Sequence, residues 1–322
     1  MKRQEKMNLN TFSERVEELR QNLGRVIVGQ KETMDLLLTA LFADGHVLIE
    51  SAPGMAKTLM AKTLARVVDA GYNRIQFTPD LMPSDVIGTS IFNMKKSEFE
   101  FRAGPLFGQM VLIDEINRAP AKTQSALFEA MEERQITVDG QTYPLRAPFM
   151  VMATQNPIEQ EGTYRLPEAQ LDRFLFMIKP QYPSEAEEVD ILERYAGTSN
   201  KDTLQTLPRV LTADELRDIQ QTLRHLTVQR PIAEYIAHII RDTRRHPAIF
   251  LGASPRAGLY LVYAAKVRAA MNGRDYVIPD DVKHLLSPVL EHRMILNPEK
   301  ELEGITLKQT ILEIADSVEV PR

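Results

Sequence analysis

Five short apolar runs, separated by helical patterns, constrain the fold of this chain more than any other feature. Each run is rich in β-branched or aromatic residues and is apolar on both faces, which is typical of buried parallel strands. The runs occupy residues 47–50, 74–78, 110–113, 149–153 and 174–178. Because helical segments separate several of them, we predict a three-layer αβα core around a parallel five-stranded sheet.

Two inserts interrupt this alternation. Residues 90–103 contain FNMKKSEFEF, in which Lys95, Lys96 and Ser97 can turn a hairpin. Residues 135–145 contain ITVDGQTY, in which the dipeptide at 139–140, Asp-Gly, is a strong signal for a hairpin turn. We therefore expect two β-hairpins that are additions to the main sheet.

The second half of the chain has a different pattern. After about residue 180 the strand signals mostly vanish and helix-start signals replace them. We predict an α/β base domain over residues 1–200 and an all-helical lid domain over residues 201–322, joined near the polar segment 198–208. The signals are a capping box at Thr212 and Glu215 and first-turn prolines at Pro231, Pro255 and Pro279.

The composition excludes several kinds of chemistry. The chain has no cysteine among its 322 residues, so disulfides, thiolate nucleophiles and cysteine zinc sites are ruled out. A formal net charge of -5 gives no electrostatic reason to expect a nucleic-acid partner. We find no signal peptide and no apolar run long enough to span a membrane, and we expect a cytoplasmic protein.

The strongest local feature follows the first predicted strand. The stretch VLIESAPGMAKTLMAKTLARVV runs from a strand through a tight turn into a helix, with Lys57 and Thr58 at the helix start. Backbone N–H groups and the helix dipole favour phosphate there, and in a P-loop the threonine hydroxyl holds Mg²⁺. The strict GxxxxGK[ST] pattern would need glycine where Ser51 and Ala56 stand. An ordinary turn with a solvated lysine is the alternative interpretation.

Two carboxylates end the third predicted strand, in MVLIDEINRAP. Acidic residues at the carboxyl end of a buried strand point into the ligand crevice of an α/β sheet. Asp114 can hold Mg²⁺ through water, and Glu115 can polarise a water for attack on a γ-phosphate. The alternative is a strand that ends in two solvated acids. The next strand ends in a polar run in which Asn156 can bind the attacking water or the γ-phosphate, or can simply form a turn.

Taken together, these stretches resemble the MoxR family of AAA+ ATPases, over about residues 26 to 293. The segments that carry the likeness are VGQ at 28–30, PGMAKT at 53–58, QFTPDLMPSDVIG at 76–88, GPLF at 104–107, VLIDEINRAPAKTQSALFEAMEERQITV at 111–138, ATQNPIEQEGTY at 153–164, LPEAQLDRF at 166–174 and GASPRA at 252–257.

The resemblance implies roles for the matched residues around ATP and Mg²⁺. Asp114 and Glu115 match Walker B, Asn156 matches sensor 1, and Thr58 with Asp114 would bind the metal ion. Val28 and Gln30 fall in the segment that lines the adenine pocket. The phosphate loop around the Walker A pair comprises Ser51, Pro53, Gly54, Met55, Ala56, Lys57, Thr58 and Leu59.

The resemblance also assigns two arginines. Arg173 matches the arginine finger that reaches the ATP of a neighbouring subunit, although a rim salt bridge with Asp172 or Glu168 is the alternative. Arg256 matches sensor 2 on the lid, where we expect it above the ATP of its own chain. Its alternative partner is a carboxylate of the base domain. Arg165 stands where the family often has proline, so it is a second candidate for the finger.

The family implies a homo-oligomer, in a hexameric ring, that hydrolyses ATP and acts as a chaperone-like motor on client proteins. Clients of the family often carry a von Willebrand A domain. Because Ser51 adds a Cβ to the phosphate loop, we expect somewhat weaker nucleotide binding than in a loop with glycine there. Two rival functions stay open, a motor subunit of a metal chelatase and a nucleotide-gated binding module with little turnover.

Overall fold

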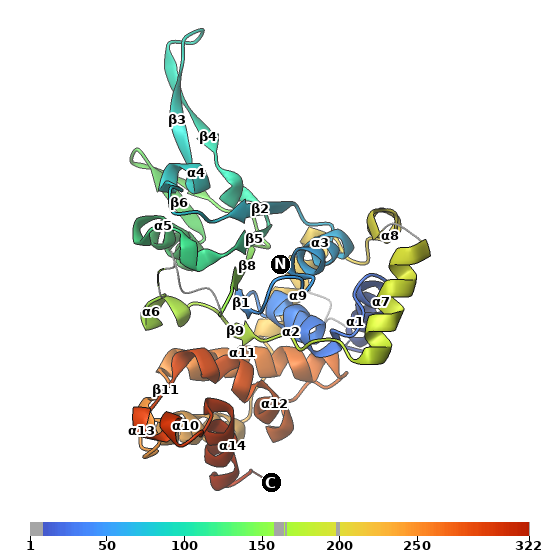
Figure 1. Ribbon diagram of the computed structural model, residues 1–322, viewed down its shortest axis with the longest axis vertical. Helices are drawn as coiled ribbons and strands as arrows, with labels where there is room; N and C mark the ends of the chain where they lie inside the picture. The colour runs from blue at the N-terminus through green and yellow to red at the C-terminus, as the bar shows by residue number, and fades with distance from the viewer. Residues whose placement is uncertain (1–8, 158–163, 165, 198–199, 322) are drawn as a thin grey trace, which may run out of the picture.

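The computed structural model describes residues 9–157, 164, 166–197 and 200–321, and it confirms the parallel α/β core. Five strands pair in the order β2-β5-β8-β1-β9, with every pairing parallel (Figure 1). Their bounds are β1 (Val47–Glu50), β2 (Tyr72–Gln76), β5 (Met110–Asp114), β8 (Met150–Gln155) and β9 (Phe176–Ile178). Each of the five predicted apolar runs thus forms a strand, within two residues at its ends.

Successive strand residues point to opposite faces of the sheet, and each face builds its own core. Ile49 and Leu112 join one buried cluster with residues of the base helices α1 (Leu9–Gly24), α2 (Lys31–Phe42) and α3 (Lys57–Val67). The opposite face packs against α4 and α5. It carries Leu48, Val111, Ile113 and Val151, and the two helices span Pro83–Ile87 and Ala121–Glu133. Burying each such side chain contributes about 1.5–3 kcal/mol, so both helical layers are held by the alternation along the strands.

Both predicted hairpins are present. The first joins β3 (Gly88–Asn93) to β4 (Glu98–Ala103) and projects away from the body of the molecule (Figure 1). The second joins β6 (Gln135–Val138) to β7 (Gln141–Pro144). Its turn dipeptide has φ 51° and 77°, a left-handed conformation that explains the glycine at the second position.

Most of the second half of the described chain is helical, as predicted. A short antiparallel ribbon of two strands is an addition that the sequence pattern did not indicate. The elements are α6 (Glu168–Leu171), α7 (Glu185–Gly197), α8 (Asn200–Thr206), α9 (Ala213–Arg224), α10 (Arg230–Thr243), β10 (Ile249–Leu251), α11 (Pro255–Met271), α12 (Pro279–Leu290), β11 (Ile295–Leu296), α13 (Pro298–Leu302) and α14 (Leu307–Ser317).

The helix-start signals in this half are confirmed. In the box that opens α9, the Glu215 amide donates to Thr212 Oγ1 at 3.2 Å and the Thr212 amide donates to Glu215 Oε2 at 2.8 Å. Pro255 and Pro279 are the first residues of α11 and α12. Ser254 does not cap α11 with its side chain, because its hydroxyl donates to Asp172 at 3.1 Å instead.

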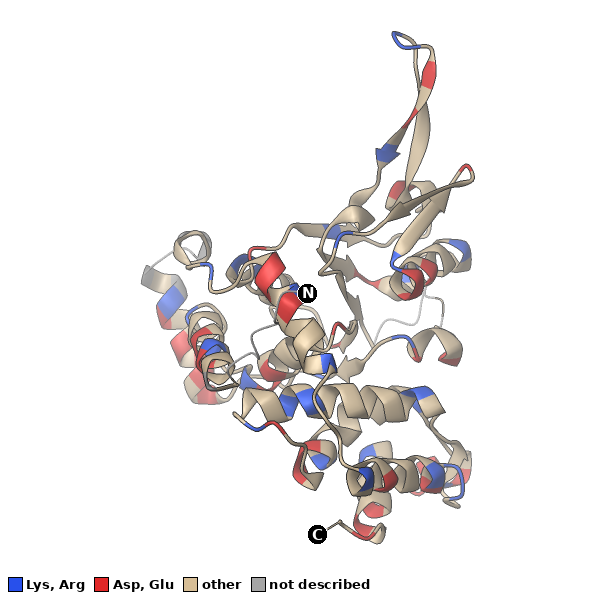
Figure 2. Ribbon diagram, turned by 180° about the vertical axis from the view of Figure 1, so that it is seen from behind, with Lys and Arg blue, Asp and Glu red and all other residues tan. Residues whose placement is uncertain are grey.

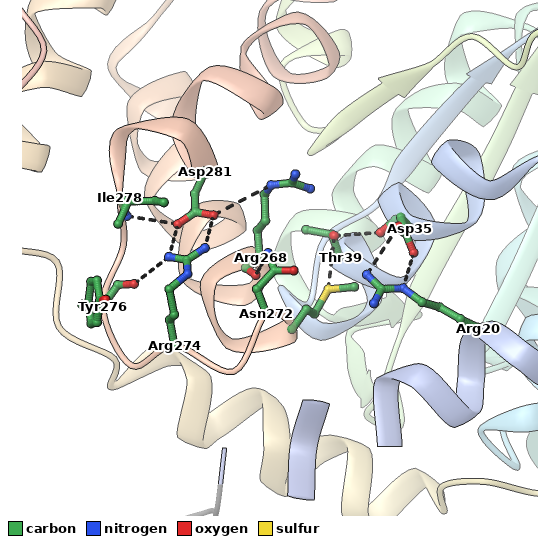
Figure 3. A network of polar contacts seen from close by, with 10 residues as sticks. Arg20, Asp35, Thr39, Arg268, Asn272, Arg274, Tyr276, Ile278 and Asp281 are labelled. Atoms are coloured by element: carbon green, nitrogen blue, oxygen red, sulfur yellow. Dashed lines mark hydrogen bonds and ion pairs between the residues drawn. The ribbon is translucent and has the colours of Figure 1, made fainter. Parts of the chain in front are cut away.

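The lid helix α11 packs directly on α1 and α2, so one apolar core runs through both halves. At this junction the Thr39 hydroxyl of α2 contacts the Met271 sulfur at 3.5 Å, and Arg20 Nε donates to Asp35 at 2.7 Å (Figure 3). A second anchor is Arg293, which lies in a 3-10 turn (Glu291–Arg293) after α12. The division into two domains near residue 200 stays a prediction, since one apolar cluster contains residues from both sides of it.

Charged residues of both signs are interspersed along the helices of base and lid (Figure 2). This mixture agrees with the small net charge of -5. Within the described ranges, no helix is both long and apolar enough to cross a membrane.

The ion pair between Arg274 and Asp281 fixes the turn between α11 and α12 (Figure 3). Asp281 is only 2% exposed, and both of its oxygens accept from the Arg274 guanidinium at 2.7 Å. Asp281→Ala should lower the free energy of unfolding by about 2–4 kcal/mol, because it leaves the half-buried Arg274 guanidinium and the Ile278 amide without their acceptor. Asp280→Ala, at the exposed neighbouring position, should cost less than about 1 kcal/mol. Chemical denaturation measures both, and equal losses would contradict this role.

Candidate functional site

The site forms where β1, β8 and β5 end, since parallel strands bring their carboxyl ends to one edge of the sheet. The loop of residues 51–56 leaves β1 and enters α3. Asp114 is the last residue of β5, and Asn156 follows β8 directly. The three sequence segments predicted to act together therefore lie on three adjacent strands.

The loop before α3 has the geometry of an anion-binding turn. Gly54 has φ 86° and Ala56 has φ 53°, so two left-handed residues turn the chain into the helix. Ala56 adopts this conformation at a cost of about 1 kcal/mol, where a strict motif has glycine. Lys57 Nζ donates to the carbonyls of Ser51 at 2.9 Å and Ala52 at 3.2 Å. The ammonium group therefore lies over the loop, which argues against the alternative of a lysine on a solvated face.

Ser51 is buried, and its amide donates to the Gln155 carbonyl of β8 at 3.2 Å. Its backbone does not adopt the left-handed region, so serine causes no backbone strain there. Its hydroxyl oxygen is buried and makes no hydrogen bond within the described residues. An unsatisfied buried hydroxyl is unfavourable, so serine is less favourable than glycine at this position of the loop.

Asp114 is buried and is held by side chains of both neighbouring strands. Arg74 Nε of β2 donates to Asp114 Oδ2 at 2.6 Å, and Thr154 Oγ1 of β8 donates to Oδ1 at 3.3 Å. The hydrogen bond to Asp114 raises the pKa of Arg74. Burial, with a further contribution from Asp114, raises the pKa of the nearby Tyr72 to about 12. Asp114 is thus a buried carboxylate that is fixed by hydrogen bonds from both neighbouring strands, which argues against a solvated acid.

Glu115 turns away from the strand in a left-handed conformation, with φ 57°. Its amide donates to Thr154 Oγ1 at 3.1 Å, so one hydroxyl connects both acidic residues. Its carboxylate accepts from Gln76 Nε2 at 2.9 Å and pairs with Arg118 Nε at 3.1 Å. Glu115 is therefore a carboxylate at the site entrance that the chain itself holds in place.

The structure gives the surroundings of Asn156 and of the segment with Val28 and Gln30, but these surroundings alone do not establish a contact with nucleotide. Asn156 is half-buried and lines a cavity with Glu50 and Lys179 at the strand ends. Val28 is half-buried, while Gln30 is buried and donates to the Gln181 carbonyl at 2.7 Å, which ties this segment to the chain after β9. Their nucleotide contacts stay predictions. Arg165 lies outside the described residues.

Arg173 and Arg256 converge on one carboxylate, Glu132 of α5. Arg173 NH1 lies 2.9 Å from Glu132 Oε2, and Arg256 NH2 donates to Glu132 Oε1 at 2.8 Å. The alternative partner expected for Arg256, a carboxylate of the base, is therefore present. Asp172, one of the alternatives for Arg173, instead pairs with Arg293 at 2.8 Å.

The structure does not bring Arg256 to the phosphate loop of its own chain, and its role at the ATP stays a prediction. Arg173 and Arg256 line a cavity together with Gly45 and His46, the two residues that precede β1, whereas the phosphate loop follows β1. A strand of this length spans about 13 Å, so the two arginines lie toward the opposite edge of the sheet. Arg256 goes there because α11 starts beside Glu132 and runs across the base helices.

The site fits a nucleotide phosphate and a divalent cation. The start of α3, with Lys57 held over the loop, supplies N–H donors and positive charge. Asp114 and Thr58 offer the hard oxygen ligands that Mg²⁺ takes. The described residues contain no cluster of three or more metal-binding side chains. A cation here would take its remaining ligands from water and phosphate.

The fold and the site define an AAA+ ATPase with a lid. The family model described as ATPase family associated with various cellular activities (AAA) matches residues 46–176, and the model of the AAA lid domain matches residues 241–314. The crystal structure of a proposed ATPase from Cytophaga hutchinsonii superposes with a TM-score of 0.90 at 40% identity, covering 98% of this chain and 97% of that one.

Two curated relatives identify the branch of this class. The chain is 42% identical to chaperone MoxR1 of Mycobacterium tuberculosis, over 92% of this chain and 80% of the relative. It is 49% identical to the uncharacterized protein YeaC of Bacillus subtilis, over 94% of this chain and 93% of the relative. The chain therefore belongs to the MoxR family of AAA+ ATPases.

Four residues of this site were missed by the sequence reasoning. Thr154 precedes a polar run that was recognised, and strand register would have placed it beside Asp114. The expectation that the run at 74–78 is apolar on both faces is wrong, because Arg74 and Gln76 alternate with the buried Ile75 and lie together on one face of β2. Glu132 gave no sequence signal, because its role depends on where α11 starts.

Substitution of Ser51 tests whether its side chain weakens nucleotide binding by the phosphate loop. Ser51→Gly should lower the ATP dissociation constant by about two- to tenfold, because it removes a Cβ and an unsatisfied hydroxyl from the phosphate loop. Ser51→Ala keeps the Cβ and should fall between the two. Equilibrium titration with a fluorescent ATP analogue measures all three proteins. If both variants bind more weakly than the wild type, the hydroxyl contacts the nucleotide and the prediction is wrong.

Proposed function

We propose that this chain hydrolyses ATP in a Mg²⁺-dependent reaction at the edge where β1, β8 and β5 end. The observation that carries the proposal is the buried, hydrogen-bonded Asp114 beside Glu115, on the sheet that also presents the loop with Lys57. Lys57, Thr58 and the amides of α3 would bind the phosphates. Bound Mg²⁺, held by Thr58 and Asp114, would offset the charge of the phosphate oxygens.

Glu115 would act as the group that polarises the attacking water, with Asn156 helping to orient it. In the present arrangement Gln76 and Arg118 both contact Oε2 of the Glu115 carboxylate and restrain its direction. We infer that hydrolysis requires the carboxylate to loosen this restraint and turn toward the phosphate. This requirement fits an enzyme whose turnover depends on assembly or on a partner.

The arginines support an assembly in which each site is completed by a neighbour. Arg173 and Arg256 lie toward the opposite edge from their own phosphate loop, at a cavity of about 580 Å³ between base and lid. Its charged lining is mainly basic, with Arg134, Arg173, Arg224, Arg256 and Lys266 against Asp44 and Glu132. A second chain could place its nucleotide against this edge, and both arginines would then act on that nucleotide. Such head-to-tail contacts close into rings, and a hexamer is the ring we propose.

We propose that the protein is a cytoplasmic, chaperone-like motor that is driven by ATP hydrolysis. Its support is the relative named chaperone MoxR1. The projecting β3–β4 hairpin and the β6–β7 hairpin would pass motion of the ring to a client protein, which could carry a von Willebrand A domain. A motor subunit of a metal chelatase would use the same base and lid, and a nucleotide-gated module would bind without turnover.

Steady-state ATPase activity across protein concentration tests hydrolysis and assembly together. Wild-type turnover per chain should rise with concentration, since complete sites need two chains. Glu115→Gln should keep ATP binding and lose about 10²–10⁴-fold in turnover, because the amide cannot accept the water proton. Binding without turnover at every wild-type concentration would favour the gated module.

Mixing two inactive variants tests the action of each arginine across the interface. Lys57→Ala should lose nucleotide binding, and Arg173→Ala should lose about 10³–10⁵-fold in turnover. Equal amounts together should regain activity, because about one quarter of the interfaces in a randomly mixed ring join an intact loop to an intact arginine. Arg256→Ala mixed with Lys57→Ala should behave alike. If that second mixture stays inactive, Arg256 serves its own chain and our assignment fails.

A further inference from the structure

Arg74 is a charged side chain at the site that the proposed hydrolysis does not use. It lies on β2, whose Gln76 stands opposite Asp114 in the parallel pairing with β5. Residues two apart on a strand share a face, so Tyr72, Arg74 and Gln76 point to the same side of the sheet. That side is the one covered by α3, because Lys62 Nζ of α3 lies 5.9 Å from the centre of the Tyr72 ring.

The contact between Arg74 and Asp114 uses the carboxylate that the metal ion needs. Arg74 Nε donates to Asp114 Oδ2 at 2.6 Å, while the other oxygen accepts from Thr154. The Asp114 side chain is 10% exposed and the Arg74 side chain is 50% exposed. The carboxylate is therefore fixed in place, whereas the guanidinium has room to turn toward solvent.

Charge explains why this pair should control metal binding. A guanidinium stays protonated, and an arginine–carboxylate hydrogen bond is among the strong ones in proteins. A divalent cation that approaches alone must compete with this pair and is repelled by the guanidinium next to its ligand. A nucleotide changes this balance, because its phosphates bring negative charge that can receive both the cation and the released arginine.

We propose that Arg74 is a positioning residue that pairs with Asp114 until nucleotide arrives, so that the site binds Mg²⁺ only together with nucleotide. This rests on the proposed ATPase function and adds an order of events to it. Contacts from β2 then restrain both acidic residues before nucleotide binds, Arg74 on Asp114 and Gln76 on Glu115.

Mn²⁺ replaces Mg²⁺ in the test, because free Mn²⁺ is measured directly by electron paramagnetic resonance. Without nucleotide, the wild type should bind Mn²⁺ at least about tenfold more weakly than Arg74→Met, which frees Asp114. Lys62→Met removes a positive charge from the same face without touching Asp114. Its Mn²⁺ affinity should stay within about threefold of the wild type, since exposed charges are screened.

Stability gives a second measurement that does not depend on turnover. Adding Mg²⁺ without nucleotide should raise the melting temperature of Arg74→Met and leave that of the wild type unchanged. Arg74→Lys retains a cation with one hydrogen-bonding group fewer, and it should lie between the two in Mn²⁺ affinity. If Arg74→Met does not fold, the uncharged polar variant Arg74→Gln takes its place, and wild-type Mn²⁺ affinity in that variant would overturn the proposal.

The outcome with ATP present separates this proposal from the proposed function. If the wild type does not bind Mn²⁺ even with ATP, the Mg-ATP site itself is wrong. If the wild type binds Mn²⁺ with ATP, and wild type and Arg74→Met bind it equally without nucleotide, only the role of Arg74 is wrong. The expected result is strong binding by both proteins with ATP, and weaker binding without nucleotide in which Arg74→Met still exceeds the wild type by about tenfold.

Discussion

Parallel pairing of the five strands is the constraint on which the rest of the structure depends. It brings the ends of β1, β8 and β5 to one edge, so residues far apart in sequence meet there without long connecting loops. The same pairing places the residues that precede the strands on the other edge, where the lid helix α11 and the two arginines gather. The chain therefore has two chemically different edges, one with acids and a phosphate loop and one rich in basic groups.

The lid and the base are joined close to one of these arginines. Arg293 of the lid is almost fully buried and pairs with Asp172, and its guanidinium also reaches the carbonyl of Phe174. Arg173 stands between these two residues in sequence. A change in lid angle would therefore act directly on the backbone that carries Arg173. This mechanical link needs no long pathway, because the lid holds the residues on both sides of the arginine.

Local patterns predicted most of the fold and much of the site. Strand periodicity, the Asp139-Gly140 turn and the capping box at Thr212 are properties of a few adjacent residues, and all were found in place. The contacts that were missed depend on tertiary packing instead. Arg74 meets Asp114 only through strand register, and Arg256 lies beside Glu132 because of the direction in which α11 crosses the base. Sequence reasoning gave Arg74 no partner, and for Arg256 it named a carboxylate of the base only as the alternative to the ATP of its own chain.

The phosphate loop and the two arginines lie at opposite edges of the sheet, so each chain has two different surfaces that would meet head to tail in an assembly. If neighbours complete one another's sites, an open row of chains has one nucleotide site at its end that lacks the arginines of a neighbour. Closing the row into a ring completes that site. The ATPase activity would then be proportional to the number of interfaces between chains and not to the number of chains. A chain in which Arg173 is substituted would inactivate the nucleotide site of its neighbour and leave its own site active. The effect of a substitution would therefore appear one position further around the assembly.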